Sequence, residues 1–194
     1  MPRAYSMQER AKLAAQTRER VVDAAVELFA ERGVQATTMT AVARAADVSP
    51  ATVTNHFATP DVLLQAVVAR LTAEIRVPDP GIFAGTRSVT GRIRALATAM
   101  FTFYERTAQW FDLLGAELTE SPVLAKAEAD FWRSIQPLYA EALAGTDSAV
   151  LAKTTSGLIH PATFRALRAA GLSIDDATTV VADALSQLAR KARR

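Results

Sequence analysis

The sequence has no cysteine among its 194 residues and only two histidines. Without cysteine the chain can form neither a disulfide nor a thiolate metal site, and this composition fits the reducing cytoplasm. Two isolated histidines with no clustered carboxylates give no metal-ligand spacing. We therefore expect no metal, no cofactor and a cytoplasmic location.

Long apolar runs are also missing. Half of the residues are hydrophobic, yet no window reaches the roughly 18 uninterrupted apolar residues of a membrane span. The N-terminus is polar and basic and has no apolar signal-peptide segment. These features predict a soluble globular protein that buries a real core and has no membrane partner.

The common signatures of catalysis are absent as well. The chain contains no G-x-S-x-G elbow, no phosphate loop ending in G-K-[ST] and no H-E-x-x-H zinc motif. No pair of carboxylates with a supporting histidine is evident. We expect that the protein is not an enzyme.

Charge is nearly balanced overall, with a formal net charge of +2, but it is unevenly distributed. Residues 1–20 carry five cations against two carboxylates, and the chain ends in Arg-Lys-Ala-Arg-Arg. A basic arm often follows a phosphate backbone, although many solubilising tails have the same composition. Because residues 1–16 show no strong apolar period, the sequence predicts a flexible basic arm there.

Helical periods begin at Thr17, and no segment shows the alternation of a strand, so the predicted fold is all-α. An apolar stripe predicts a first helix over 17–32 that Gly33 ends. The second helix is capped by Thr37 or Thr38, and Ser49 before Pro50 starts the third. Thr59 and Pro60 repeat this signal for a fourth helix that reaches about 76, with Val62, Ala66 and Ala69 on one stripe.

The clearest break is the segment 77–86, which contains two prolines and two glycines. It predicts one domain over 17–76, with the fourth helix as connector, and a second over 77–194. Pro137 and Pro161 lie inside helical patterns and are expected to kink or interrupt them. About nine helices are predicted in all, the later ones at about 88–105, 108–118, 122–144, 148–170 and 174–190.

The stretch 37–57 carries the main functional signal. On a helical wheel Pro50, Val53 and Phe57 point into a small core, so Ala51 and Asn55 point directly away from it. Two short helices joined by a tight turn, with small polar side chains outward, fit the major groove of DNA. The alternative is the solvated face of a small helical bundle, but such a face would carry Glu and Lys, and the third helix has neither.

Four motifs in this region occur in order. They are AA-x-x-LF-x-x-x-G from Ala24, TT-x-x-x-x-A from Thr37, A-x-V-S-x-x-T-V from Ala46 and HF-x-x-x-x-x-L from His56. Residues 18–64 closely resemble the DNA-binding domain of TetR-family transcriptional regulators. The resemblance implies an N-terminal three-helix helix-turn-helix domain followed by a helical ligand-binding and dimerisation domain.

In function, the resemblance implies a ligand-responsive regulator, by the family's usual mode a repressor, that binds palindromic operator DNA as a homodimer and is released by a small-molecule inducer. The wheel and the resemblance together give the DNA-binding candidates Thr38, Thr40, Ser49, Ala51, Thr52, Thr54, Asn55 and His56.

Two positions depart from the family pattern. Thr54 stands where the family usually has Tyr, and Pro60 where it usually has Lys. By that pattern both positions contact the DNA backbone, so the departures put the strength of DNA binding in doubt. They keep open the alternative of an interaction module that has this fold without binding DNA.

The second domain is rich in aromatic residues at helical spacing, most of them expected in the core. The resemblance implies an inducer among the middle helices, and the scarcity of charge in the apolar stripes suggests a mainly apolar one. Ligand candidates are Phe101, Tyr104, Trp110, Phe131 and Trp132. Small and branched residues on the last two helices are the dimer-interface candidates, namely Leu158, Ile159, Ala177, Val181, Ala184 and Leu188.

Overall fold

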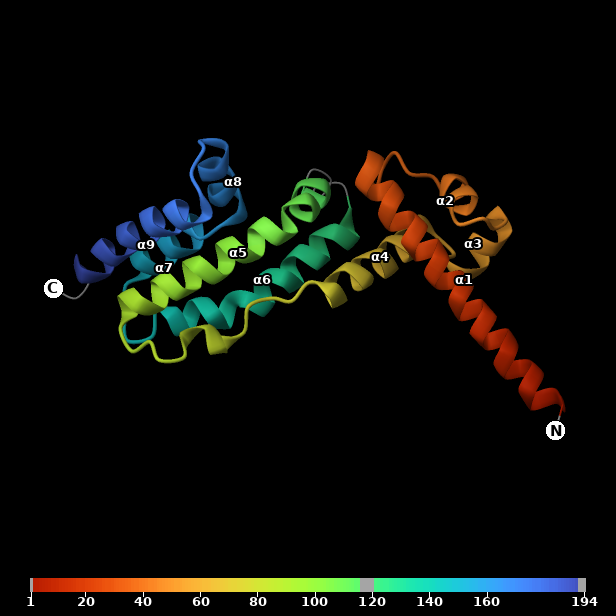
Figure 1. Cartoon of the computed structure of the whole chain (residues 1–194), viewed down its shortest axis with the longest axis horizontal. Helices are drawn as coiled ribbons and strands as arrows, with labels where there is room; N and C mark the ends of the chain where they lie inside the picture. The colour runs from red at the N-terminus through yellow and green to blue at the C-terminus, as the bar shows by residue number, and fades with distance from the viewer. Residues whose placement is uncertain (1, 116–120, 192–194) are drawn as a thin grey trace. The chain divides into compact units, whose positions relative to one another are not determined.

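The computed structural model describes residues 2–115 and 121–191, and these ranges contain helices and loops but no β-strand (Figure 1). This confirms the prediction of an all-α fold with about nine helices. Within the described ranges the helices are α1 (Pro2–Arg32), α2 (Met39–Ala45), α3 (Pro50–His56), α4 (Pro60–Glu74), the short 3-10 helix η1 (Pro80–Phe83), α5 (Val89–Gly115), α6 (Pro122–Ala142), α7 (Ala149–Leu158), α8 (Pro161–Ala169) and α9 (Ile174–Lys191).

The chain divides into two compact units. The first comprises residues 1–76 together with 112–128, and the second comprises 77–111 together with 129–194. One division therefore falls at the start of the segment 77–86 that is rich in proline and glycine. The sequence gives no sign that 112–128, where α5 ends and α6 begins, belongs with the first unit.

Helix α1 is 31 residues long and starts at Pro2, whereas the sequence predicts a flexible arm up to residue 16. The prediction rested on the missing apolar period, but this stretch is rich in Ala, Gln, Glu, Lys and Arg, which favour helix without any packing. Residues 7–16 are all exposed. The predicted end of the helix is correct, because Gly33 takes a positive φ of 85° there.

The core of the first unit joins α1 to α2 and α3. Val21 and Ala25 of α1, Val42 of α2 and Val53 of α3 are each at most 1% exposed. Pro50, expected on the same inward side as Val53, is exposed. Pro50 occupies the first position of α3, before the helix reaches the core. At this position a backbone N–H has no partner within the helix, so the missing N–H of proline costs no hydrogen bond.

Helix α4 packs through a different stripe from the predicted one. Leu63, Leu64 and Val67 are buried, while Val62 is 40% exposed and Ala69 is exposed. The prediction was wrong by one position because two alternative stripes fit the helical period. The stripe with leucine side chains removes more apolar surface from water, so it faces the core.

Proline has opposite effects at two positions of the second unit. Pro137 lies inside α6 without ending it. Pro161, in contrast, divides the predicted helix 148–170 into α7 and α8, with the His160 side chain accepting a hydrogen bond from the Ala162 N–H at 3.2 Å.

The predicted break between 105 and 108 does not occur. Helix α5 is continuous there, and the Thr107 hydroxyl donates to the Phe103 carbonyl of the preceding turn at 2.8 Å.

The break at Pro161 is stabilised by two buried tyrosines. The hydroxyls of Tyr139 and Tyr104 lie 2.5 Å and 3.4 Å from the Ile159 carbonyl oxygen and donate to it. Ile159 caps α7, so its carbonyl lies outside the regular helical hydrogen bonds. Burial raises the pKa of Tyr139 to about 12, and burial next to Tyr139 raises the pKa of Tyr104 as well. Both phenols stay neutral and remain hydrogen-bond donors at neutral pH.

Tyr139→Phe should lower the free energy of unfolding by about 1–2 kcal/mol, because it removes the shorter of the two bonds to a buried carbonyl. Tyr104→Phe removes the longer bond and should cost less. Urea unfolding of both variants followed by circular dichroism measures the difference. Equal losses would show that the two hydroxyls contribute equally, contrary to the geometry.

Candidate nucleic-acid interface

Helices α2 and α3 form a helix-turn-helix within the first unit. The turn between them is tight, since the Val48 N–H donates to the Ala43 carbonyl at 3.0 Å and the Asp47 N–H to the Arg44 carbonyl at 3.3 Å. Asp47 has a φ of 53° and is the non-glycine residue with positive φ among the described residues. Asp tolerates this left-handed conformation better than most residues.

Each helix of the motif begins at a side-chain cap. The Thr38 hydroxyl accepts from the Ala41 N–H, and the Ser49 hydroxyl accepts from the Thr52 N–H, both at 3.1 Å. The Thr59 hydroxyl does the same for α4 at 3.3 Å. These caps satisfy N–H groups that a helix start leaves unpaired, so the sequence signals placed the helix starts correctly.

The outward face of α3, defined here as Ala51, Thr54 and Asn55, is exposed to solvent. Thr52 and His56 lie beside it and are half-buried. The exposure of Ala51 and Asn55 matches the helical-wheel prediction. The side-chain amide of Asn55 makes no hydrogen bond to another described residue, so its donor and acceptor are both available.

The hydroxyl groups near this face are partly engaged within the protein. Thr54 donates to the Pro50 carbonyl at 3.1 Å, and Thr52 lies 2.8 Å from the Ser49 hydroxyl. A threonine that bonds its own helix offers less to a partner than a free amide does. Among the residues of α3, Asn55 is therefore the strongest candidate for reading a base edge.

Helix α2 presents a second exposed surface. Thr38 and Thr40 are exposed, and so is Arg44, which lies four residues after Thr40 and hence on the same side of the helix. The sequence prediction omitted Arg44. The spacing of four residues from Thr40 is a signal that could have found it, since a guanidinium at that position can form charge-assisted bonds to phosphate.

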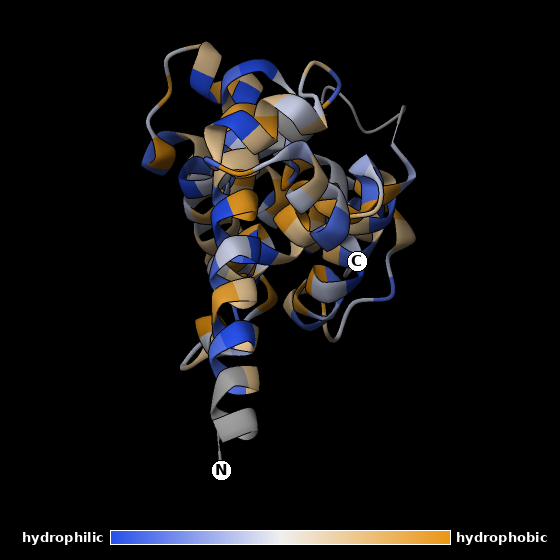
Figure 2. Ribbon diagram, turned by 90° about the vertical axis from the view of Figure 1, so that its right-hand side faces the viewer, coloured by the Kyte–Doolittle hydropathy of each residue, from blue (hydrophilic) through white to orange (hydrophobic). Residues whose placement is uncertain are grey.

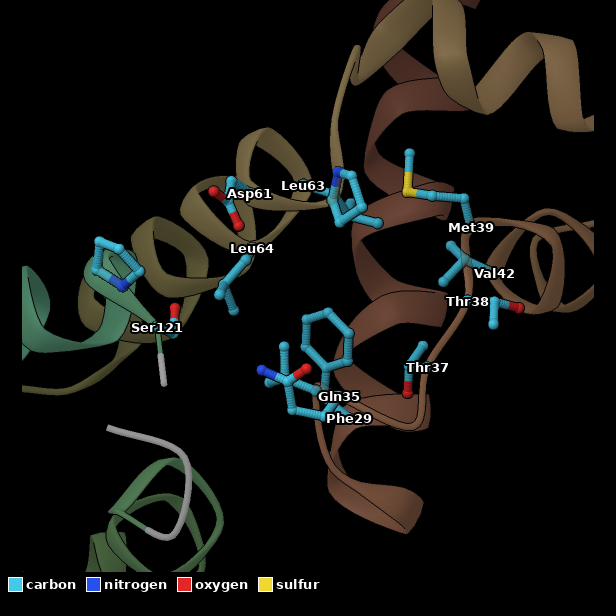
Figure 3. Close-up of a pocket in the computed structure, with 13 residues that line it drawn as sticks. Phe29, Gln35, Thr37, Thr38, Met39, Val42, Asp61, Leu63, Leu64 and Ser121 are labelled. Carbon is cyan, nitrogen blue, oxygen red and sulfur yellow. The ribbon is translucent and has the colours of Figure 1, made fainter. Parts of the chain in front are cut away.

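A cavity of about 490 Å³ lies elsewhere in the first unit. Phe29, Val42 and Leu64 contribute its apolar wall, and Thr38 and Asp61 contribute polar atoms (Figure 3). The outward face of α3 does not line it. That face is an open surface, which suits contact with a large partner rather than enclosure of a small molecule.

The candidate ligand residues of the second unit separate into two groups. Phe101 and Tyr104 are buried, and the centre of the Phe101 ring lies 4.9 Å from that of Phe164.

The other group is half-buried. Phe131 stacks on Phe103 with ring centres 5.7 Å apart, and Trp132 stacks on His160 with ring centres 5.0 Å apart. Trp110 is also half-buried. The stack with His160 was not anticipated from the sequence, because the two residues lie far apart in the chain.

The candidate dimer residues also separate. Ile159, Ala177 and Val181 lie in the core of the second unit, at 0–3% exposure. Leu158 and Leu188 are half-buried and Ala184 is exposed. Two further apolar side chains are more than half exposed: Val180, which lies on the predicted apolar stripe of the last helix, and Val150 of α7, which the sequence prediction omitted.

Comparison with known proteins supports the interpretation of α2 and α3 as a helix-turn-helix. Residues 21–67 match the family described as bacterial regulatory proteins, tetR family. The HTH-type transcriptional regulator UidR of Escherichia coli (strain K12) is 36% identical over 70 residues, which are 34% of this chain and 36% of UidR. These findings show that the N-terminal region of this chain is similar to that of tetR-family regulators.

Solved structures extend the likeness of fold to most of the chain. A transcriptional regulator from Rhodococcus sp. Rha1 has a TM-score of 0.64 at 20% identity and covers 90% of this chain and 97% of its own. The multidrug binding protein EbrR complexed with proflavin has a TM-score of 0.60 at 20% identity, covering 89% of this chain and 99% of its own. The helical second unit therefore has the fold of these proteins.

Across residues 2–115 and 121–191, no helix combines the length and the apolar character that a membrane crossing requires. The same ranges contain no group of three or more His, Cys, Asp or Glu side chains arranged to hold a metal ion.

The turn of the helix-turn-helix can be tested at Asp47. Asp47→Val should lower the free energy of unfolding by about 1–2 kcal/mol, since a β-branched side chain is strained at positive φ. Asp47→Gly removes the strain and should leave stability within about 1 kcal/mol of the original. Thermal unfolding compares the two variants, and a Val variant as stable as the Gly variant would contradict the left-handed turn.

Proposed function

We propose that this protein is a ligand-responsive transcriptional regulator that acts as a repressor and binds palindromic operator DNA as a homodimer. The observation that carries the proposal is the outward face of α3, with its free Asn55 amide and no charged side chain. An amide can bond adenine through two hydrogen bonds in the major groove, and carboxylates there would repel the phosphates. The match of residues 21–67 to the tetR family supports the same interpretation.

The DNA-binding candidates divide by role. Ala51, Thr52 and Asn55 face the bases in this proposal, with Ala51 able to contact the methyl group of thymine. Thr38, Thr40, Ser49, Thr54 and His56 contact the backbone, and Arg44 joins them with a full positive charge. Polar and cationic side chains of this kind set the register of a protein on the duplex.

For the second unit we propose a small, mainly apolar inducer with an aromatic ring system. The half-buried Trp110, Phe131 and Trp132 offer aromatic surface on which such a ring can stack. EbrR, which shares the fold, was solved with proflavin bound. Phe101 and Tyr104 then form the floor beneath the inducer rather than its first contacts.

The proposed release is a shift between two conformations of the dimer that differ in the spacing of their α3 helices. A ligand displaces DNA only to the extent that it binds the non-binding conformation more tightly. The segment 75–88, which follows α4 and includes the short η1, is the connection where such a movement is absorbed. Two α3 helices in a dimer would reach half-sites about one DNA turn, roughly 34 Å, or more apart.

Dimerisation is proposed through the exposed apolar residues of α7 and α9. Val150, Val180 and Ala184 are exposed, and Leu158 and Leu188 are half-buried. An isologous pairing of this surface would remove these side chains from water in both copies. Such a pairing needs no change in the buried Ile159, Ala177 and Val181.

Selection of bound sequences from random DNA, repeated with aromatic ligands such as proflavin, tests the function as a whole. The expected result is an enriched palindrome whose binding weakens when a ligand is added. Failure to enrich any sequence would favour an interaction module that has this fold without binding DNA.

Asn55→Ala tests the assignment of the base-reading residue. It should weaken binding to the selected operator by about 1–3 kcal/mol, because a bidentate base contact is lost. Binding to unrelated DNA should change little. Gel shifts on both duplexes give the two losses, and an equal loss on each would contradict base reading by Asn55.

Val180→Glu tests the dimer surface. A carboxylate without a partner in an apolar interface costs several kcal/mol, so the dimer should weaken by about a hundredfold or more. Ala129→Glu, at an exposed position of α6, is the matched control and should leave the association unchanged. Sedimentation equilibrium measures both, and two dimers of equal strength would place the interface elsewhere.

A further inference from the structure

Helix α1 extends beyond the part of the first unit that it packs against. From residue 7 onward its first buried residue is Val21, and residues 7–16 are all exposed. At 1.5 Å per residue, the stretch from 2 to 16 extends about 20 Å. Figure 1 shows this end of α1 standing clear of α2, α3 and α4, and Figure 2 colours the turns of α1 by hydropathy. An isolated helix of this length is marginal in water, so the extension gains most from a partner.

The helical register gives the extension two distinct sides. Arg10 lies eighteen residues before Leu28, which is about five full turns, so the two share a side of the helix. Leu28 is buried in the core of the first unit. The stripe that is apolar where α1 packs in the first unit thus carries Arg10 beyond the packed part.

The opposite side of the extension carries Lys12. It lies seven residues before Glu19, about two turns, and so shares its side. The Glu19 carboxylate pairs with the Arg70 guanidinium of α4 at 2.8 Å. Arg10 therefore lies on the side of α1 that faces α2 and α3, and Lys12 on the side that faces α4.

Arg18 lies where the extension leaves the packed part of α1, and its side chain contacts the end of α3. Its guanidinium carbon lies 5.0 Å from the centre of the Phe57 ring, and Phe57 caps the C-terminus of α3. Arg10 lies eight residues further towards the N-terminus, about 12 Å along the helix axis. It is thus placed past the end of α3, on the side that α3 occupies.

We propose that the extension of α1 is a second DNA contact, in which Arg10 binds a backbone phosphate beside the bases that α3 faces. This inference rests on the proposed function and adds a partner surface to it. A guanidinium bonds phosphate through two parallel hydrogen bonds. From residue 7 to residue 18 this side carries no carboxylate, and its members are Met7, Arg10, Ala11, Ala14, Thr17 and Arg18.

The contact is independent of base sequence and depends on salt. Each phosphate neutralised releases condensed counterions and adds about 0.9 to the slope of log affinity against log salt concentration. Arg10 should therefore raise the affinity for operator and unrelated DNA by the same factor. Its partner phosphate lies outside the bases that α3 reads, so the duplex must extend past them.

Arg10→Ala and Lys12→Ala form a matched pair, since each removes one exposed cation and both introduce the residue that favours helix most. The probe is a labelled duplex with the selected operator and ten further base pairs on each side, titrated by anisotropy at several salt concentrations. For Arg10→Ala we expect the slope to fall by about 0.9 for each α1 bound. For Lys12→Ala we expect the slope to stay unchanged.

A duplex trimmed to the operator provides the second arm. There Arg10→Ala should bind as tightly as the original protein, because the flanking phosphate is gone. Equal slopes for both variants and the original protein on the long duplex would overturn the inference while leaving the proposed function intact. Failure of the original protein to bind any duplex would instead overturn the proposed function itself.

Discussion

The burial of Val53 and Phe57 fixes the direction in which α3 presents its polar side chains. Helix α3 spans only seven residues, and a helix this short does not persist in water without tertiary contacts. Both side chains are fully buried, and they lie four residues apart on one side of the chain. That anchoring leaves α3 no freedom to rotate, so Asn55 points outward because Val53 and Phe57 point inward. Any change that loosens this core also misdirects the residues that would read DNA.

Local signals predicted the first unit well because they act within a few residues. Thr38, Ser49 and Thr59 each satisfy a helix-start N–H three residues later, and such a cap needs no information about the rest of the fold. The predictions of helix extent and packing failed in two places, one where an apolar period was missing and one where two apolar stripes fitted the same helix. The missing apolar period before Thr17 hid a helix that propensity alone supports, and α4 offered two stripes of which Leu63 and Leu64 decided the buried one.

The candidate sites show the same difference between local and tertiary information. The exposed side of α3 follows from its register alone, so Ala51 and Asn55 were predicted correctly as outward-facing. Phe101 and Phe131 carry the same ring at helical spacing, yet one is buried and the other half-buried. Only the packing of α5 and α6 against distant segments separates them. The stack of Trp132 on His160 likewise depends on contacts that no spacing along the chain reveals.

The contacts of α4 limit how a signal can reach α3. Arg70 pairs with Glu19 at 2.8 Å and with Asp23 at 3.2 Å, but these side chains are 39–53% exposed, so each pair contributes only about 0–1 kcal/mol. The buried leucines of α4 contribute far more, at about 1.5–3 kcal/mol for each fully buried side chain. Helix α4 is therefore held in the first unit mainly by buried apolar side chains rather than by its ion pairs. A displacement of α4 would consequently carry the whole helix-turn-helix with it, changing where α3 lies rather than how α3 is folded.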